Sequence, residues 1–171
     1  MKLKTFLFKS VTSTNDIAIN KIKQGIISGI IFAKKQTKGR GRYGNKWISM
    51  NNNLFMSIFF NLNSKVSFKK LTYNTCEIVQ KSLIKFLNKK IQIKRPNDLL
   101  INKKKVCGIL QETIFFNDKK FVIIGIGINI DRSPDITKYP TTYINLHLKK
   151  KITSFKIYNE IKNNFENFLK K

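Results

Sequence analysis

The chain has 171 residues, a formal net charge of +25 and a hydrophobic content of 42%. This length and apolar content suit one domain with a buried core and exclude a disordered basic tail. No apolar run reaches the roughly 18–20 residues that a membrane-spanning helix needs, and the amino terminus lacks the long apolar region of a signal peptide.

Hydrophobic periodicity and turn residues predict secondary structure along the whole chain. The predicted elements, in chain order, are a strand at 4–9, a helix at 13–25, a strand at 29–34, a loop at 35–53, a strand at 54–60, a helix at 68–88, a strand at 91–94, a turn at 95–98, strands at 106–116 and 121–130 joined by a hairpin at 117–118, an irregular segment at 132–150, and a helix at 153–170. Strands and hairpins mixed with long amphipathic helices indicate an α+β fold, in which a mixed sheet packs against helices.

The positive charge comes almost entirely from lysine, which is spread along the whole chain. Two explanations stay open. The charge can serve binding to nucleic acid or another polyanion, or it can reflect a genome whose codons favour lysine, asparagine and isoleucine. The even spread favours the second explanation, because a dedicated nucleic-acid binder more often clusters its charge and uses arginine. In both cases the charge would speed association with an acidic partner.

Cysteine and histidine are scarce. Cys76 and Cys107 lie far apart and outside any CxxC pair, and His147 is the only histidine. We expect two buried, reduced thiols and a cytoplasmic protein. One histidine without a cysteine cluster does not make a zinc site of the usual kind.

The segment GRGRYGNKW at 39–47 is the most informative part of the sequence. It holds three glycines, the only tryptophan, and two of the four arginines in the chain. Glycine lets the backbone approach a ligand closely, and arginine can grip a carboxylate or phosphate with two nitrogens. The segment is neither a dinucleotide fingerprint nor a P-loop, because a tryptophan and a strand follow the glycines. It predicts a mobile anion-binding loop, although a plain surface loop or an RNA-contacting turn fits the composition as well.

Two further motifs are compatible with a ligand site. Residues 13–15, Ser-Thr-Asn, can cap a helix or present hydroxyl and amide groups to a polar ligand. The stretch 95–98, Arg-Pro-Asn-Asp, is good turn chemistry. It can also direct an amide and a carboxylate into a pocket, with Lys105 brought back by the next strand.

In this order and at these spacings, the motifs resemble those of the biotin protein ligases. The resemblance covers almost the whole chain: STN at 13–15, GRGRYGNKW at 39–47, NLFMSIFF at 53–60, RPNDLLINKKKVCGIL at 95–110 and GIGINI at 125–130. It implies the class II synthetase-like catalytic fold that biotin and lipoate ligases share. It also implies a two-step reaction with ATP, Mg²⁺ and biotin. Biotin attacks the α-phosphate of ATP to give biotinyl-AMP, and a lysine of the biotin carboxyl carrier protein of acetyl-CoA carboxylase then attacks this mixed anhydride.

The resemblance also assigns roles to residues. Lys105, Arg40 and Asp98 are the expected catalytic residues: Lys105 stabilises charge in the first step, Arg40 closes over the intermediate, and Asp98 orients or deprotonates the acceptor lysine. The expected biotin-binding residues are Ser13, Thr14, Asn15, Gln36, Gly39, Arg40, Gly41, Arg42, Lys105 and Gly108, the last of which leaves room for the ligand. The expected nucleotide-binding residues are Arg40, Arg42, Trp47, Asn97, Lys105 and Asn129. No metal ligand from a side chain is predicted, since Mg²⁺ is expected to accompany ATP.

The sequence departs from the family in two respects. Arg95 stands where the family usually has tryptophan, and we expect it to flank the pocket, either adding a phosphate contact or facing solvent. Residues 1–171 are expected to be a single catalytic domain without the N-terminal helix-turn-helix domain and the C-terminal β-barrel domain of many members. Specific DNA binding and membrane association are therefore not expected, an acidic carrier protein is the expected partner, and homodimerisation stays open. The alternatives are a lipoate-protein ligase-like transferase, an RNA- or polyanion-binding module, and a ligase fold that has lost activity.

Overall fold

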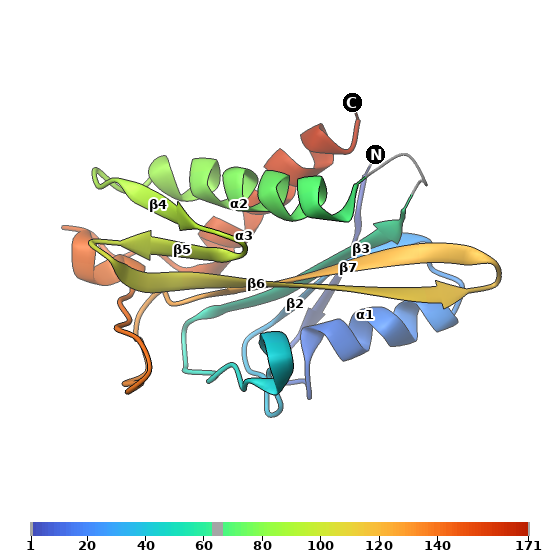
Figure 1. Cartoon of the computed structure of the whole chain (residues 1–171), viewed down its shortest axis with the longest axis horizontal. Helices are drawn as coiled ribbons and strands as arrows, with labels where there is room; N and C mark the ends of the chain where they lie inside the picture. The colour runs from blue at the N-terminus through green and yellow to red at the C-terminus, as the bar shows by residue number, and fades with distance from the viewer. Residues whose placement is uncertain (1, 63–66, 171) are drawn as a thin grey trace.

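The computed structural model describes residues 2–62 and 67–170, and its centre is a seven-stranded sheet (Figure 1). The strands are β1 (Lys4–Phe8), β2 (Ser28–Ala33), β3 (Leu54–Asn61), β4 (Ile91–Lys94), β5 (Asp98–Ile101), β6 (Lys104–Phe116) and β7 (Lys119–Ile128). Their order across the sheet is β1-β2-β3-β7-β6-β5-β4. The pair β1–β2 is parallel and the other pairs are antiparallel. The predicted mixed sheet is thus confirmed.

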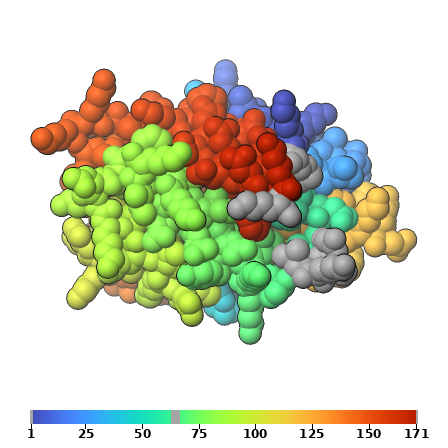
Figure 2. Space-filling view, turned by 90° about the horizontal axis from the view of Figure 1, so that it is seen from above, coloured from blue at the N-terminus to red at the C-terminus, as the bar shows by residue number. Residues whose placement is uncertain are grey.

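Three helices cover the two faces of this sheet: α1 (Thr14–Lys23), α2 (Phe68–Ile84) and α3 (Ser154–Phe168). Helix α1 packs on β2, β3 and β7 at one face, whereas α2 and α3 contact each other and the opposite face. Figure 2 shows α2 in green beside α3 in red, together covering that side of the molecule. The α+β class is confirmed.

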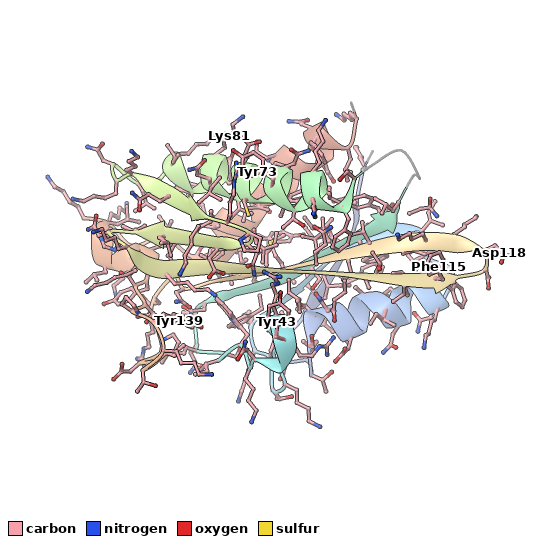
Figure 3. The ribbon with its side chains drawn as sticks, in the orientation of Figure 1. Tyr43, Tyr73, Lys81, Phe115, Asp118 and Tyr139 are labelled. Atoms are coloured by element: carbon pink, nitrogen blue, oxygen red, sulfur yellow. The ribbon has the colours of Figure 1, made fainter. Side chains whose placement is uncertain are left out.

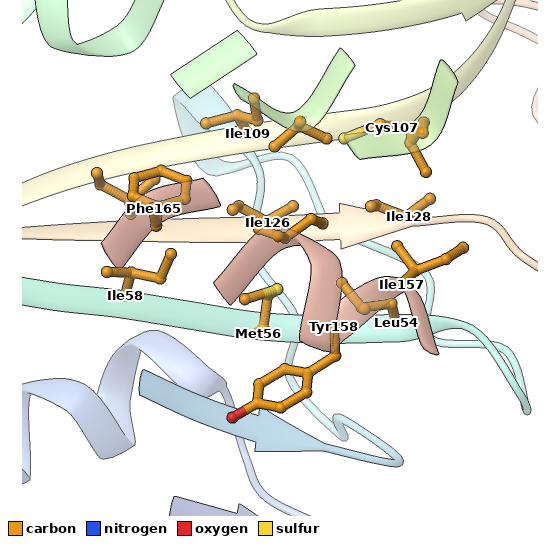
Figure 4. Packing of buried hydrophobic residues seen from close by; sticks show 14 of the residues in the cluster. Leu54, Met56, Ile58, Cys107, Ile109, Ile126, Ile128, Ile157, Tyr158 and Phe165 are labelled. Carbon is orange, nitrogen blue, oxygen red and sulfur yellow. The ribbon is translucent and has the colours of Figure 1, made fainter. Parts of the chain in front are cut away.

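Successive side chains of the central strands point to opposite faces of the sheet, one of which carries a large core and the other of which is covered by α1. Leu54, Met56 and Ile58 of β3 point into the large core with even-numbered residues of β7, under α2 and α3 (Figure 4). On the α1 side, Phe59 of β3 and Ile123 of β7 form a smaller core with α1. Further along the same two rows come small residues, Ser57 on β3 and Gly125 and Gly127 on β7. This change leaves room on the sheet beside the first residues of α1.

The strand β5 was missed in the sequence prediction, which assigned a turn up to Asp98 and began the next strand at 106. Asn102 and Lys103 connect β5 to β6 with φ angles of 50° and 62°. In a sequence, a tight turn with two left-handed residues is usually recognised by Asn-Gly or Asp-Gly. The Asn-Lys pair here gave no such signal, so four apolar-rich residues were too few to stand out.

The remaining differences are at element ends. The second helix stops at Ile84 and not at 88, because Phe86 and Leu87 donate to carbonyls three residues back and tighten the chain into turns. The segment 132–150 is irregular as expected, apart from a short 3-10 helix, η2 (Ile144–His147). None of the described helices has the length and apolar character to cross a membrane.

Candidate active site

The segment 39–47 folds back on itself as a small hairpin and is not an extended loop. Trp47 N donates to Gly39 O at 3.0 Å, and Gly41 N donates to Asn45 O at 2.7 Å. At its tip is a 3-10 turn, η1 (Arg42–Gly44), with positive φ at Tyr43 and Gly44. The hairpin stands on the α1 side of the sheet, where Tyr43 is labelled in Figure 3. The backbone therefore holds both arginines and Trp47 over the small-residue region of the sheet.

The first residues of α1 form a buried polar group beneath this hairpin. Ser13, Thr14 and Asn15 are each 3% exposed. Gln36 Oε1 accepts from Thr14 N at 2.8 Å and from Thr14 Oγ1 at 3.1 Å, which ties the segment after β2 to the helix start. The hydroxyl of Ser13 occupies the N-cap position but makes no capping hydrogen bond. The predicted cap position is thus confirmed, but the hydroxyl does not satisfy the helix start and is available to a ligand.

Ser57 joins the polar group from below. Its Oγ lies 2.7 Å from Thr14 Oγ1 and 2.5 Å from Asn15 Oδ1, and it is fully buried in β3. A single hydroxyl proton serves one of these two acceptors at a time. Asn15 also lies against Gly125, where a Cβ atom would come within 2.6 Å of Asn15 Oδ1. Glycine at this position thus allows the close approach of Asn15, and the β6–β7 register runs past it without a bulge.

Trp47 lies on a pair of glycines that face each other across β6 and β7. Gly108 and Gly127 are register partners. A Cβ on Gly127 would lie 2.5 Å from Trp47 Cε2, and one on Gly108 would lie 2.7 Å from Trp47 Cζ3. The indole ring therefore packs directly on Gly108, which also lines the cavity, and the role of this glycine in leaving room for the ligand stays a prediction.

Lys105 and Asp98 form an ion pair at the start of β5 and β6. Lys105 Nζ lies 2.8 Å from Asp98 Oδ1, and the two side chains are 15% and 22% exposed. The contact is electrostatic, because Oδ1 receives no hydrogen bond of good geometry from the described residues. Lys105 Nζ also lies 5.6 Å from the centre of a Trp47 ring and 5.1 Å from that of Tyr139, within range of cation–π attraction. A carboxylate and two aromatic rings thus fix the position of this ammonium.

The irregular segment after β7 holds the backbone of Lys105. Lys105 N donates to Pro140 O, and Thr142 N donates to Lys105 O, both at 2.9 Å. Tyr139 is carried into the site next to these bonds, on the same side of the sheet as Tyr43 (Figure 3). The sequence offered no signal for this contribution, since a tyrosine between two prolines in an irregular stretch has no distinctive spacing.

Asn97 links the turn before β5 to the hairpin. Its Nδ2 donates to Ile109 O at 2.8 Å, and its Oδ1 accepts from Arg42 Nη1 at 3.2 Å. Arg42 Nη2 donates to the hydroxyl of Tyr43 at 2.7 Å. The contacts of Arg42 within the described residues are thus with neutral groups.

These residues surround a cavity of about 490 Å³, within the usual size range of small-molecule sites. The sequence-predicted residues that line it are Ser13, Thr14, Asn15, Gln36, Arg40, Gly41, Arg42, Trp47, Asn97, Asp98, Lys105 and Gly108. Segments more than ninety residues apart in the chain thus converge on one cavity. Ile136, Lys138 and Tyr139 add a wall that the sequence did not predict.

Three predicted residues lie elsewhere. Gly39 is outside the cavity lining and allows close packing on Trp47 O. Asn129 is buried behind Lys105 and Trp47, where its Nδ2 donates to Thr142 O at 3.2 Å and its Oδ1 accepts from Asn53. Arg95 is exposed and stacks over Tyr73 of α2, 5.2 Å from the ring centre. Arg95 does not line the cavity, and of its two expected roles the structure supports facing solvent.

Ser57 and Glu112 were missed by the sequence reasoning. Each had a usable signal. Ser57 is a hydroxyl in an otherwise apolar strand, and Glu112 lies four residues after Gly108 and so on the same face of β6. The Oε2 atom of Glu112 accepts from Asn15 Nδ2 at 2.5 Å.

The two cysteines are buried and free, as expected. Burial raises the pKa of the Cys76 thiol to about 11 and also raises the pKa of Cys107. Both thiols are therefore protonated near neutral pH and do not act as nucleophiles.

Comparison with known proteins identifies the class of this fold and site. The profile of the biotin/lipoate A/B protein ligase family matches residues 7–129. The chain belongs to this family. It is 35% identical over 128 residues to the bifunctional ligase/repressor BirA of Bacillus subtilis, covering 72% of the chain and 38% of BirA. It is 28% identical over 145 residues to biotin–protein ligase 2 of Arabidopsis thaliana, covering 81% of the chain and 43% of that protein. The chain thus spans about two fifths of the length of these relatives.

Solved structures point to the biotin branch of the family. The biotin protein ligase of Leishmania major, in complex with biotinyl-5-AMP, superposes with a TM-score of 0.83 and 25% identity over 96% of this chain and 74% of its own. The Aquifex aeolicus enzyme, in complex with biotin and ATP, gives a TM-score of 0.82 and 28% identity over 98% and 70%. The predicted biotin protein ligase catalytic fold is confirmed.

Proposed function

We propose that this protein attaches biotin to a lysine of the biotin carboxyl carrier protein of acetyl-CoA carboxylase, with ATP as the energy source and biotinyl-5′-AMP as the intermediate. The observation that carries the proposal is that two chemically different groups line one cavity. Neutral hydroxyls and amides that are at least 91% buried gather around Thr14, and cations gather around Lys105. The first group suits a polar but uncharged head such as a ureido ring, and the second suits carboxylate and phosphate.

In the first step, a carboxylate oxygen of biotin attacks the α-phosphorus of ATP, the bond to the bridging oxygen breaks, and pyrophosphate leaves. The charge that develops on the α-phosphate needs a fixed cation in a site with little water. Lys105 meets this need, since Asp98 and two aromatic rings hold its ammonium in place. Arg42 can leave its neutral partners and bind phosphate oxygens at little electrostatic cost.

In the second step, the amine of the acceptor lysine attacks the carbonyl carbon of the mixed anhydride, and AMP leaves with the phosphate oxygen. That amine must first lose a proton, because its unperturbed pKa is about 10.4. Asp98 is the carboxylate that lines the cavity, and we assign it to accept this proton. Its contact with Lys105 gives it a second role, because it orients the Lys105 ammonium. We therefore assign Asp98 to both steps.

Mg²⁺ is bound in such sites through phosphates, water and one or two carboxylates. Among the described residues, no group of three or more His, Cys, Asp or Glu side chains is placed to hold a metal ion. Asp98 is the candidate protein ligand, and ATP would supply the remaining oxygens. When bound, the ion would neutralise part of the phosphate charge.

The test is incubation of the whole chain with biotin, Mg²⁺, ATP and an apo carrier domain, with pyrophosphate release and biotin transfer measured separately. Both are expected. Absence of both would contradict the proposal, and transfer of lipoate alone would establish the lipoate-ligase alternative. Tight, salt-sensitive RNA binding without either reaction would establish the polyanion-binding alternative.

The partners and surroundings belong to the same proposal. With 34 basic and nine acidic residues, the chain would associate fastest with an acidic carrier domain. The free, buried cysteines favour a reducing compartment such as the cytoplasm. We treat residues 1–171 as one catalytic domain because the residues of the site lie on a single sheet and on the segments packed against it.

A further inference from the structure

Arg40 differs from the other cations of the site in its contacts. Its Nη1 lies 2.6 Å from Asp16 Oδ1 on α1, and its Nη2 lies 3.4 Å from Glu112 Oε2 on β6. The guanidinium fork thus connects the hairpin to two other elements. The chain has 34 basic residues and only nine acidic ones, and two of those nine contact this one arginine. We call Arg40, Asp16 and Glu112 the clasp.

Glu112 also connects the clasp to the polar group at the start of α1. The same Oε2 atom that faces Arg40 accepts from Asn15 Nδ2 at 2.5 Å. Asn15 Oδ1 faces Ser57, so the contact with Glu112 decides which end of the Asn15 amide points toward the sheet. Removing the negative charge of Glu112 would therefore disturb both the hairpin and this amide.

We propose that Asp16 and Glu112 are positioning residues, which fasten the 39–47 hairpin over the cavity through Arg40 and set the orientation of Asn15. Arg40, whose charge is met by two carboxylates, then acts as the fastening of a lid and not as a phosphate ligand. Arg42 and Lys105 remain the cations for phosphate. The inference rests on the proposed function for its effect on the intermediate, but not for its effect on the hairpin.

The clasp residues are about one-third exposed, with side-chain exposures of 38%, 36% and 32% for Arg40, Asp16 and Glu112. Solvent screens such contacts, so the clasp can open when substrates enter and close afterwards. A tightly buried network would not permit this exchange. A lid that holds a reactive anhydride needs this combination of defined geometry and modest strength.

The first measurement is independent of enzymatic activity. Trp47 is the only tryptophan of the chain and lies on the hairpin. Acrylamide quenches the fluorescence of an accessible indole, so quenching of Trp47 should increase as the hairpin opens. We expect the D16N/E112Q and R40A variants to show at least a twofold larger quenching constant than the unaltered chain. The E160Q variant, which removes the carboxylate that pairs with Lys85 away from the cavity, should behave as the unaltered chain. Unchanged quenching in D16N/E112Q would overturn the proposal.

The second measurement follows labelled biotinyl-AMP released into solution without an acceptor. D16N/E112Q, R40A and the triple variant should release biotinyl-AMP about equally fast, roughly tenfold faster than the unaltered chain. The effects should not add, because all three variants break the same set of ion pairs. The KM for ATP should change less than twofold. If R40A raises this KM tenfold and D16N/E112Q does not, Arg40 is a phosphate ligand and the proposal is overturned.

The measurements distinguish failure of the proposed function from failure of the proposed fastening of the hairpin. If the unaltered chain forms no biotinyl-AMP, the proposed function is wrong, yet increased quenching in the clasp variants would still support the fastening of the hairpin. Melting temperatures of the variants should stay within a few degrees of the unaltered chain. Near-isosteric amides are used at both carboxylates so that the fold is kept.

Discussion

At the scale of single residues, the packing of Trp47 on Gly108 and Gly127 leaves no room for a Cβ atom at either glycine. We predict that Gly127→Ala destabilises the protein by about 1–3 kcal/mol, because the new methyl group would overlap the indole ring and the sheet below cannot move. Thermal or urea unfolding measures the loss. Trp47→Ala should relieve most of it in the double variant, and simple additivity of the two changes would contradict this explanation.

Asp98 offers a second test at this scale. Asp98→Asn keeps the size of the side chain but removes the charge opposite Lys105. We predict at least a tenfold slower pyrophosphate release as well as slower transfer to the carrier, because Lys105 loses the partner that orients it. Single-turnover measurements separate the two steps. If adenylate formation is unchanged and only transfer is slow, Asp98 serves the acceptor lysine alone.

Most residues of the site could be found from the sequence because each carries unusual chemistry for its position. Ser13, Arg42 and Lys105 stand in short polar motifs, and the structure brings them to one cavity. Glu112 shares a face of β6 with Gly108, but its role depends on Arg40, 72 residues away, and no local pattern encodes that pairing. The packing of the Trp47 indole on Gly108 and Gly127 was likewise not predictable, because the three residues come from separate segments that meet only in the fold.

At the scale of elements, the caps of the two long helices give a matched pair of variants. Thr153 Oγ1 accepts from Lys156 N at 3.3 Å at the start of α3, whereas Ser67 makes no capping hydrogen bond at the start of α2. We predict that Thr153→Ala costs about 1 kcal/mol of unfolding free energy and that Ser67→Ala changes it by less than about 0.5 kcal/mol. Equal losses measured by urea unfolding would contradict the difference seen between the two caps.

The elements themselves were mostly predictable, and the exceptions have local causes. Long strands such as β3 and amphipathic helices such as α3 bury enough apolar surface to dominate any competing pattern. The turn at Asn117 and Asp118 was also recognised, and both residues have positive φ. The four-residue strand β5 owes its existence to its neighbours on the sheet, which a single-sequence reading does not supply.

At the scale of the whole molecule, the excess of positive charge has a use and a cost. It attracts anionic substrates and an acidic carrier, but it also makes the folded chain repel itself. Three of the nine acidic residues pair with cations of the site: Asp98 contacts Lys105, and Asp16 and Glu112 contact Arg40. Two further ion pairs, Lys85–Glu160 and Lys151–Asp131, lie away from the site, and most of the lysines have no ion-pair partner among the described residues.

We therefore predict that the melting temperature rises when salt is increased from about 10 mM to about 150 mM, over which the Debye length falls from about 30 Å to about 8 Å. Replacing the exposed Lys69, Lys70 and Lys81 of α2 by glutamine should raise the melting temperature at low salt and flatten its salt dependence, because repulsion is reduced. In Figure 3, the labelled Lys81 lies at α2, on the other side of the sheet from Tyr43 and Tyr139. Scanning calorimetry at several salt concentrations makes the measurement, with sodium sulfate avoided because sulfate stabilises proteins by exclusion. A melting temperature that falls with added salt would show that attraction at the site, and not repulsion over the surface, governs the stability of this chain.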